Sequence, residues 1–197
     1  MKSQPVRTAV YIVALSPYLT AAVAIALTAA ASSSSEPTRL TAQPSLLDIA
    51  NNKADVIILE ELTPQLADAL DLNGFKNAFP YQALEPGEYG SGVGIWSRFP
   101  ITLSERIEGF RLKMVSADIA IPGAQQDTVF VATHLPAPWP QDTEPWRDEI
   151  ERLPATIQAI KDHADGRAVI VAGDFNATYD MAPFRNLLTN GFASAAA

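Results

Sequence analysis

A run of β-branched apolar residues that stops abruptly at a glycine constrains the fold of this chain more than any other feature. Val169-Ile-Val-Ala172 leads to Gly173, and an acid and an amide, Asp174 and Asn176, follow two residues apart. Such a run predicts a buried strand, and α/β proteins commonly place their chemistry where buried strands end. A carboxylate and a carboxamide there suit a divalent cation and a phosphate. A plain strand-to-turn junction is the alternative, because Gly, Asp and Asn all favour turns.

Two further strands are predicted to end in polar side chains. The strand expected over residues 54–59 ends at Glu60 and Glu61, and the apolar run 129–132 leads to His134. Glu61 suits a carboxylate ligand of Mg²⁺ or Mn²⁺, whereas Glu60 is expected to point to the opposite face of the strand. Simpler interpretations remain open, because glutamates before a helix complement its dipole and a lone histidine at a strand end can be structural.

The rest of the chain mixes helix and strand signals. Thr63 followed by Pro64 predicts the start of a helix over residues 65–72, which Gly74 ends. The other expected elements are helices over 45–52, 146–164 and 182–188, a strand over 90–97, and an antiparallel strand pair over 111–121 and 127–133. This order favours a layered α/β or α+β sandwich over a purely parallel sheet.

The N-terminal segment predicts a membrane anchor. Lys2 and Arg7 precede an apolar stretch over residues 8–31, which approaches the ~20 residues needed to cross a bilayer. Basic residues on its N-terminal side place that end in the cytoplasm and the rest of the chain outside. We therefore expect a single-pass protein of the cell membrane with an extracytoplasmic domain. A signal peptide cleaved near Ala31, giving a secreted protein, and a buried soluble helix are the alternatives.

Composition bounds the domain and its partners. Residues 1–31 are the expected anchor or signal, the Ser- and Pro-rich residues 32–44 a linker, and residues 45–197 one domain. The absence of cysteine excludes disulfides, zinc–thiolate sites and cysteine nucleophiles. A formal net charge of -8 disfavours broad attraction to nucleic acid. A phosphate substrate remains compatible with this charge, because a bound metal supplies positive charge locally.

Four segments together resemble the endonuclease/exonuclease/phosphatase family, metal-dependent phosphodiesterases with a DNase I-like fold. The resemblance covers residues 54–192 and implies an α/β (α+β) fold, a DNase I-like layered β-sandwich flanked by helices. The segments, in chain order, are Asp55-Val-Ile-Ile-Leu-Glu-Glu61-Leu-Thr63, Gly92-Val-Gly-Ile-Trp-Ser-Arg98-Phe-Pro100, Thr133-His134-Leu135 and Gly173-Asp174-Phe-Asn176-Ala177.

The resemblance also implies roles for individual residues. Glu61 would coordinate Mg²⁺ or Mn²⁺, and Asp174 and Asn176 would bind the metal or the phosphate and orient the attacking water. His134 would contact the scissile phosphate or assist the leaving group, while Arg98 is expected to be structural. The expected function is an exported, membrane-tethered phosphoesterase acting on a nucleic acid, a nucleotide or a lipid head group. The sequence indicates no protein partner.

The chain departs from the family pattern at two places. Family members carry an early strand that ends in Asn, whereas the short segment 38–44 offers no such strand. Their final Asp-His pair, which polarises the nucleophilic water, has no counterpart, since the chain ends at Ala197 and its two histidines, His134 and His163, lie elsewhere. The domain is therefore expected to be partial. A truncated or degenerate family member without catalysis and an exported binding module are the alternative functions.

Overall fold

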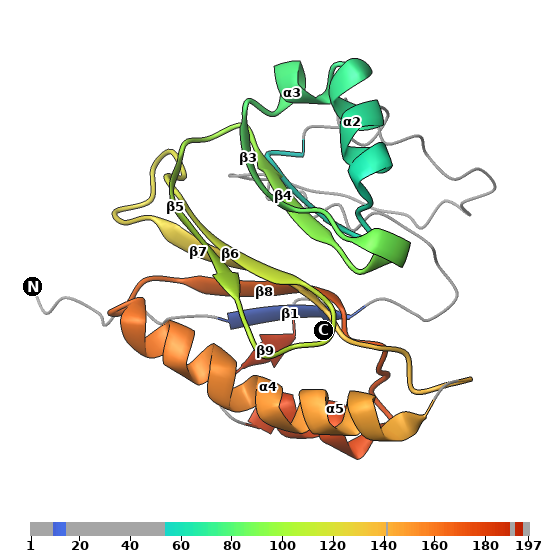
Figure 1. The fold of residues 1–197 in the computed structure, drawn as a ribbon. Helices are drawn as coiled ribbons and strands as arrows, with labels where there is room; N and C mark the ends of the chain where they lie inside the picture. The colour runs from blue at the N-terminus through green and yellow to red at the C-terminus, as the bar shows by residue number, and fades with distance from the viewer. Residues whose placement is uncertain (1–9, 15–53, 141, 190–191, 195–197) are drawn as a thin grey trace, which may run out of the picture.

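Two β-sheets pack face to face, and helices cover the outer face of each sheet (Figure 1). The computed structural model describes residues 10–14, 54–140, 142–189 and 192–194. The strands are β1 (Val10–Ala14), β2 (Val56–Glu60), β3 (Tyr81–Glu85), β4 (Val93–Ser97), β5 (Ile101–Ile107), β6 (Met114–Ile119), β7 (Thr128–His134), β8 (Val169–Asp174) and β9 (Ala193–Ser194). The helices are α2 (Pro64–Leu72), α3 (Phe75–Ala78), α4 (Thr143–His163), α5 (Ala182–Thr189) and the 3-10 turn η1 (Glu88–Gly90).

The larger sheet has the strand order β5-β6-β7-β8-β1-β9, and the smaller sheet has the order β2-β4-β3. Strands β5, β6 and β7 run antiparallel, as do the three strands of the smaller sheet. Strand β8 instead lies parallel to β7 and to β1. The predicted antiparallel pair is confirmed as β6 and β7, with Ala117 opposite Phe130. The predicted layered sandwich is confirmed as well.

Apolar side chains fill three layers between the elements. Val56 and Ile58 of β2 face Phe130 and Ile170 of the larger sheet, while Ile57 of the same strand points outward to the α2–α3 layer. The outer face of the larger sheet packs on α4 and α5. Both faces of β2 are buried. Its residues before Glu60 are therefore all apolar, rather than alternating between apolar and polar.

Local sequence signals place the helices as expected. Thr63 caps α2, since its Oγ1 accepts a hydrogen bond from Leu66 N at 3.1 Å, and Pro64 takes the first helical position. Gly74, in the left-handed conformation, follows the end of this helix. Helix α4 continues through Pro154, although proline within a helix removes a backbone hydrogen bond.

The N-terminal segment differs from its prediction where the structure describes it. Residues 10–14, expected inside an apolar membrane helix over 8–31, form strand β1, with Val10 opposite Val169 of β8. β-branched and aromatic residues such as these favour a strand, and a short apolar run has no periodicity that distinguishes a strand from a helix. No helix within the described ranges is long and apolar enough to span a bilayer. The remainder of 8–31, the linker 32–44 and the helix 45–52 lie outside the described residues.

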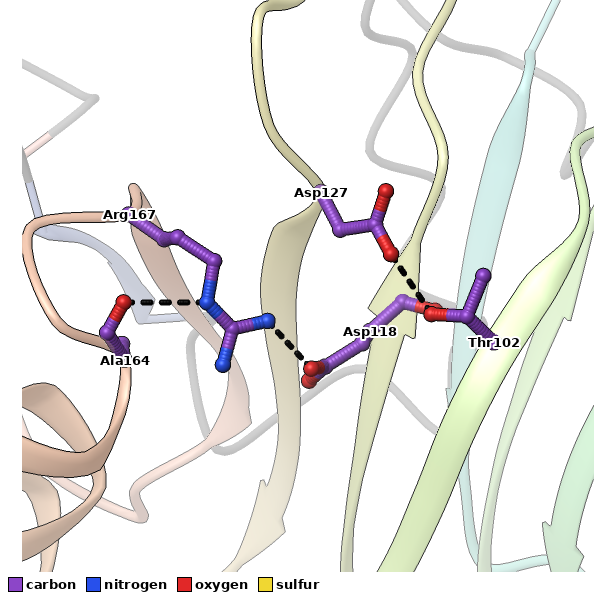
Figure 2. Close-up of polar contacts among 5 residues, drawn as sticks. All are labelled: Thr102, Asp118, Asp127, Ala164 and Arg167. Carbon is purple, nitrogen blue, oxygen red and sulfur yellow. Dashed lines mark hydrogen bonds and ion pairs between the residues drawn. The ribbon is translucent and has the colours of Figure 1, made fainter.

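An ion pair joins the strands at the starting end of β8 (Figure 2). Arg167 Nη1 donates a hydrogen bond to Asp118 Oδ2 of β6, and Arg167 Nε donates to Ala164 O, just past the end of α4, at 2.9 Å. Nearby, Thr102 Oγ1 donates to Asp127 Oδ2 at 2.6 Å. Asp118 is buried. The pair therefore fixes where α4 ends and where β8 enters the sheet.

Replacing Arg167 by methionine tests this contact. The change leaves the Asp118 carboxylate buried without its cation, so we expect a loss of about 1–3 kcal/mol in the free energy of unfolding, measured in urea. Arg106→Met is the matched control, because Arg106 forms exposed ion pairs with Glu85 and Glu108. It is expected to cost less than about 1 kcal/mol. Equal losses in the two variants would show that the Arg167 pair adds nothing.

Candidate active site

Strands β7 and β8 end side by side and bring two of the predicted site residues together. In the register of this parallel pair His134 lies opposite Asp174, and Leu135 N donates to Asp174 O at 2.9 Å just beyond the strands. Parallel strands present their carboxyl ends at one edge of a sheet, which is where ligands bind in many α/β proteins. The carboxyl edge of β7 and β8 is therefore the candidate site.

Asn176 is fixed in the turn that follows β8. Its backbone N–H donates to Asp174 Oδ1 at 2.7 Å, and its side-chain Nδ2 donates to Leu135 O at 2.8 Å. The residue is buried and has φ 47, a left-handed conformation that Asn tolerates better than most residues. This turn therefore holds Asp174 and Asn176 together at the edge, so the turn is itself part of the candidate site.

Gly173 allows β8 to approach two other strands closely. A Cβ atom on Gly173 would lie 1.8 Å from Thr133 O of β7 and 3.0 Å from Glu60 Oε1 of β2, and the residue has φ 145. No other residue type fits this space without displacing backbone. The glycine therefore lets the end of β2, from the smaller sheet, reach the edge where β7 and β8 end.

The acidic pair at the end of β2 differs from its prediction. Glu60 was expected to point away from the site, but its side chain is buried and its Oε1 lies against Gly173. Glu61 is exposed, has φ 55 and packs beside Gly90, whose added Cβ would lie 3.4 Å from Glu61 Cβ. The left-handed conformation ends the strand's alternation at Glu60. Both glutamates therefore lie within electrostatic reach of Asp174.

Burial and neighbouring carboxylates disfavour the ionisation of Glu60 and Asp174. Burial raises the pKa of Asp174, and the nearby Glu61 carboxylate adds to the rise. Burial likewise raises the pKa of Glu60 well above its usual range, with further contributions from Asp174 and Glu61. Glu60 Oε1 is buried without a hydrogen-bond partner. Such a set of oxygen atoms is stabilised by a cation.

The donor set fits a hard divalent cation in its chemistry. Mg²⁺ typically takes one or two protein carboxylates and keeps several waters. Within the described ranges, however, no three or more His, Asp or Glu side chains gather closely enough to hold a metal ion by themselves. The donor set thus suits a cation that is bound mainly by water and substrate, with Glu61 and Asp174 within electrostatic reach of each other.

His134 is a neutral imidazole at physiological pH. Its side chain is buried, its Nδ1 has no hydrogen-bond partner, and burial lowers its pKa to about 4. A neutral imidazole can donate from one ring nitrogen and accept at the other. The second histidine, His163, lies at the exposed end of α4 as expected, with Nδ1 2.7 Å from Ala159 O.

Two residues that the sequence analysis did not single out support the site from α4 and the β5–β6 loop. Glu149 of α4 is buried, and its Oε1 accepts the backbone N–H of Arg111 at 2.8 Å. Lys113, at the other end of that loop, donates from its backbone N to Ser91 O at 2.8 Å and from Nζ to Pro86 O. The two Lys113 contacts hold the turn containing η1, which packs against Glu61 through Gly90, whereas the Glu149 contact holds the β5–β6 loop to α4. A glutamate on the apolar face of the predicted helix 146–164 was the available signal.

The sequence profile of the endonuclease/exonuclease/phosphatase family matches residues 36–196. The chain therefore belongs to this family of phosphoester hydrolases. This confirms the predicted resemblance.

Solved structures of several proteins share the fold of this chain. Sphingomyelinase C from Streptomyces griseocarneus has a TM-score of 0.58 at 21% identity, over 71% of this chain and 57% of that one. D. rerio TDP2 complexed with single strand DNA product has a TM-score of 0.57 at 22% identity, over 72% and 55%. A beta toxin mutant from Staphylococcus aureus with bound magnesium ions has a TM-score of 0.53 at 21% identity, over 71% and 58%.

The chain thus matches between 55% and 58% of the length of these three structures. At such identities the likeness shows the fold, and the roles of Glu61, His134, Asp174 and Asn176 remain predictions. No curated protein sequence matches the chain.

The buried state of His134 predicts a pH-dependent stability. An unfolded imidazole binds its proton near pH 6.5, whereas folded His134 does so only near pH 4. Between these values the unfolded state binds more protons, so this contribution to stability is complete above pH 6.5 and is lost as the pH falls toward 4. Between about pH 7 and about pH 4.5, wild type should lose about 2 kcal/mol more unfolding free energy than His134→Gln.

Urea unfolding in the presence of a chelator measures this difference. His163→Gln is the matched control, because His163 is exposed, and it should follow wild type. The interpretation fails if His134→Gln shows the same loss of stability with falling pH as wild type.

Proposed function

We propose that this protein hydrolyses a phosphoester bond with the help of Mg²⁺ or Mn²⁺. The observation that carries the proposal is the convergence of Glu61, His134, Asp174 and Asn176 from three strand ends and one turn at a single edge. Family membership supports the reaction class, and the beta toxin mutant with bound magnesium ions supports the metal.

Glu61 and Asp174 are the residues that would hold the cation. When bound there, it would neutralise phosphoryl oxygens and lower the pKa of a coordinated water. The effect of the Glu61 carboxylate on the pKa of Asp174 supports this assignment, because a divalent cation would neutralise the negative charge of both groups. The unpartnered Glu60 Oε1 is the further oxygen atom that faces this edge.

The chain's own residues would position the substrate. Asn176, held by Leu135 O and Asp174 Oδ1, is pre-oriented beside the phosphate position, so no side-chain ordering is needed when substrate binds. His134, as a neutral imidazole, would donate a hydrogen bond to a phosphoryl oxygen or to the leaving-group oxygen. The buried surroundings of both residues strengthen these hydrogen bonds.

A family member that binds a cation without efficient turnover is the second candidate. The observation that favours it is the placement of the two histidines, since His163 lies on the exposed end of α4 and only His134 reaches the site. The resemblance assigns water activation to a further Asp-His pair. Without a general base, hydrolysis is expected to be slower by about 10²–10⁴-fold.

Hydrolysis of bis-p-nitrophenyl phosphate tests the proposal. With Mg²⁺ or Mn²⁺ we expect turnover that a chelator abolishes, and Asp174→Asn should lower kcat by about 10²-fold or more because it removes a carboxylate ligand. Glu61→Gln should do the same. Asp162→Asn is the matched control, since Asp162 is an exposed acid near the end of α4 that accepts a hydrogen bond from Gln158; its turnover should equal that of wild type.

Thermal unfolding with and without the cation separates the two candidates. A cation that binds the folded state should raise Tm of wild type but not of Asp174→Asn. Such a shift without turnover would favour the second candidate. A chain that neither turns over substrate nor responds to either cation would contradict both.

We also propose that residues 1–31 direct the domain across the membrane as an anchor or a cleaved signal. Lys2, Arg7 and the apolar stretch 8–31 support this. Strand β1 uses residues 10–14 of the same stretch, so one molecule cannot keep β1 in its sheet and the same residues in a bilayer.

A reporter enzyme that is active only outside the cytoplasm, fused after Ala197, measures the location. We expect reporter activity for wild type and its loss when Lys2 and Arg7 are changed to glutamate, because the orientation depends on these charges. A reporter that is inactive in wild type, with the protein in the soluble fraction, would contradict export and favour the sheet that contains β1.

A further inference from the structure

Three exposed aromatic side chains stand on three separate loops that border the candidate active site. We define them as the aromatic rim: Tyr89 of η1, Trp139 in the loop between β7 and α4, and Tyr179 in the loop between β8 and α5. Trp139 is 82% exposed, Tyr179 is 49% exposed and Tyr89 is fully exposed. Exposed apolar residues gathered at one place, rather than scattered, indicate a binding surface.

Each rim residue lies near a predicted site residue, either through a packing contact or because few residues separate the two in the chain. Tyr89 precedes Gly90, which packs on Glu61. Trp139 follows His134 by five residues, and Tyr179 follows Asn176 by three, so neither can lie further than about 17 Å from its site residue. All three segments lie toward the right-hand side of Figure 1, where β7 and β8 end.

Contacts with neighbouring elements fix the loop of Trp139 and the ring of Tyr179 in place. Thr143 Oγ1 donates to Pro138 O at 3.1 Å, which ties the proline-rich loop that carries Trp139 to the start of α4. The ring of Tyr179 packs edge-on against Phe184 of α5, with 5.4 Å between centroids. A proline-rich loop is already restricted in conformation, so it loses little conformational entropy when its tryptophan binds to a partner.

The charges around the rim select the kind of partner. An acidic residue lies within three positions of each rim residue in the sequence: Glu88, Asp142 and Asp180. Among the nearby cations, Lys113 pairs with Glu85 and Arg185 donates to the Tyr179 carbonyl oxygen, whereas Arg147, one turn into α4, is exposed. The acidic residues beside the rim thus outnumber the exposed cation. A polyanion such as nucleic acid or an anionic bilayer is therefore disfavoured.

We propose that the aromatic rim docks the domain on a zwitterionic lipid surface and presents the phosphoester of a lipid head group to the site. Tryptophan and tyrosine favour the interface between lipid and water, where the ring enters the acyl boundary and its polar atom stays hydrated. A zwitterionic surface accepts the rings without attracting or repelling their acidic neighbours. The inference rests on the proposed function and names its substrate class.

Fluorescence of Trp139 tests the docking directly. The chain has three tryptophans, and Trp96 and Trp146 are buried, so exposure to lipid is reported by Trp139. The full chain is titrated with phosphatidylcholine vesicles in a chelator, which removes any dependence on catalysis. We expect a blue shift of the emission, quenching by phosphatidylcholine brominated on its acyl chains, and no weakening as salt is raised. Replacing part of the lipid by phosphatidylserine should weaken binding.

Two variants show whether the rim acts as a unit. Tyr89→Ala removes a second ring and leaves the Trp139 reporter, and we expect the vesicle affinity to fall by about threefold to tenfold. In the control, Leu72→Trp is combined with Trp139→Phe, which moves the reporter to a site that is 88% exposed at the far end of α2. Brominated lipid should not quench this tryptophan, even if the N-terminal segment holds the chain on the vesicle.

Three results would overturn the inference. The first is a lack of quenching of Trp139 in the folded protein, and the second is quenching of the tryptophan introduced at position 72 that is as strong as that of Trp139. The third is a change of Trp139 fluorescence with a single-stranded oligonucleotide rather than with lipid. Hydrolysis of soluble bis-p-nitrophenyl phosphate by wild type is scored separately. Turnover without docking rejects only the lipid inference, and docking without turnover rejects only the proposed function.

Discussion

The close approach of three strands at Gly173 is the contact on which the candidate site depends. With hydrogen as its side chain, this residue lets the carbonyl of Thr133 and the carboxyl group of Glu60 come within the space that a Cβ would fill. The parallel register of β7 and β8 then sets His134 opposite Asp174. The smaller sheet contributes Glu60 and Glu61 only because β2 can reach this edge. The two sheets are thus joined at the point where the polar residues gather.

The two ends of β8 differ in their electrostatics. At the starting end of β8, Arg167 and Asp118 neutralise each other. At the finishing end, Glu60 is buried and Asp174 is half-buried; burial raises the pKa of both carboxyl groups, and neighbouring carboxylates add to the rise. A domain keeps such unfavourable electrostatics where a ligand relieves it, which is why perturbed carboxyl groups mark functional sites.

Much of this was predictable from the sequence because the buried strands carry strong signals. The apolar runs of β2, β7 and β8 are covered on both faces, and each ends at a polar residue, so both the sandwich and the meeting of His134 with Asp174 follow from the pattern. Strands β3 and β5 were not predicted. Both lie at sheet edges, and β5 is exposed along most of its length, so neither has a clear apolar pattern.

The predictions that differ from the structure failed for local structural reasons. Glu60 follows the alternation of Val56 and Ile58, so it faces the larger sheet and reaches Gly173. Glu61 takes a left-handed conformation after the strand and lies within electrostatic reach of Asp174 as well, which alternation along an ideal strand does not anticipate. Residues 10–14 form β1 although the stretch reads as part of a membrane helix, because an apolar run does not by itself distinguish a strand from a helix. The support that Lys113 and Glu149 give to the site depends on contacts between distant segments.

The central claim is that a divalent cation binds at the edge where β2, β7 and β8 end. The most direct measurement is paramagnetic broadening of backbone amide signals by Mn²⁺ in a ¹⁵N-labelled sample. We expect selective loss of the signals of Glu61, Leu135 and Asn176, with the signals around Asp118 and Arg167 unaffected. Broadening that is spread over the acidic surface, or that is centred on another part of the chain, would contradict it.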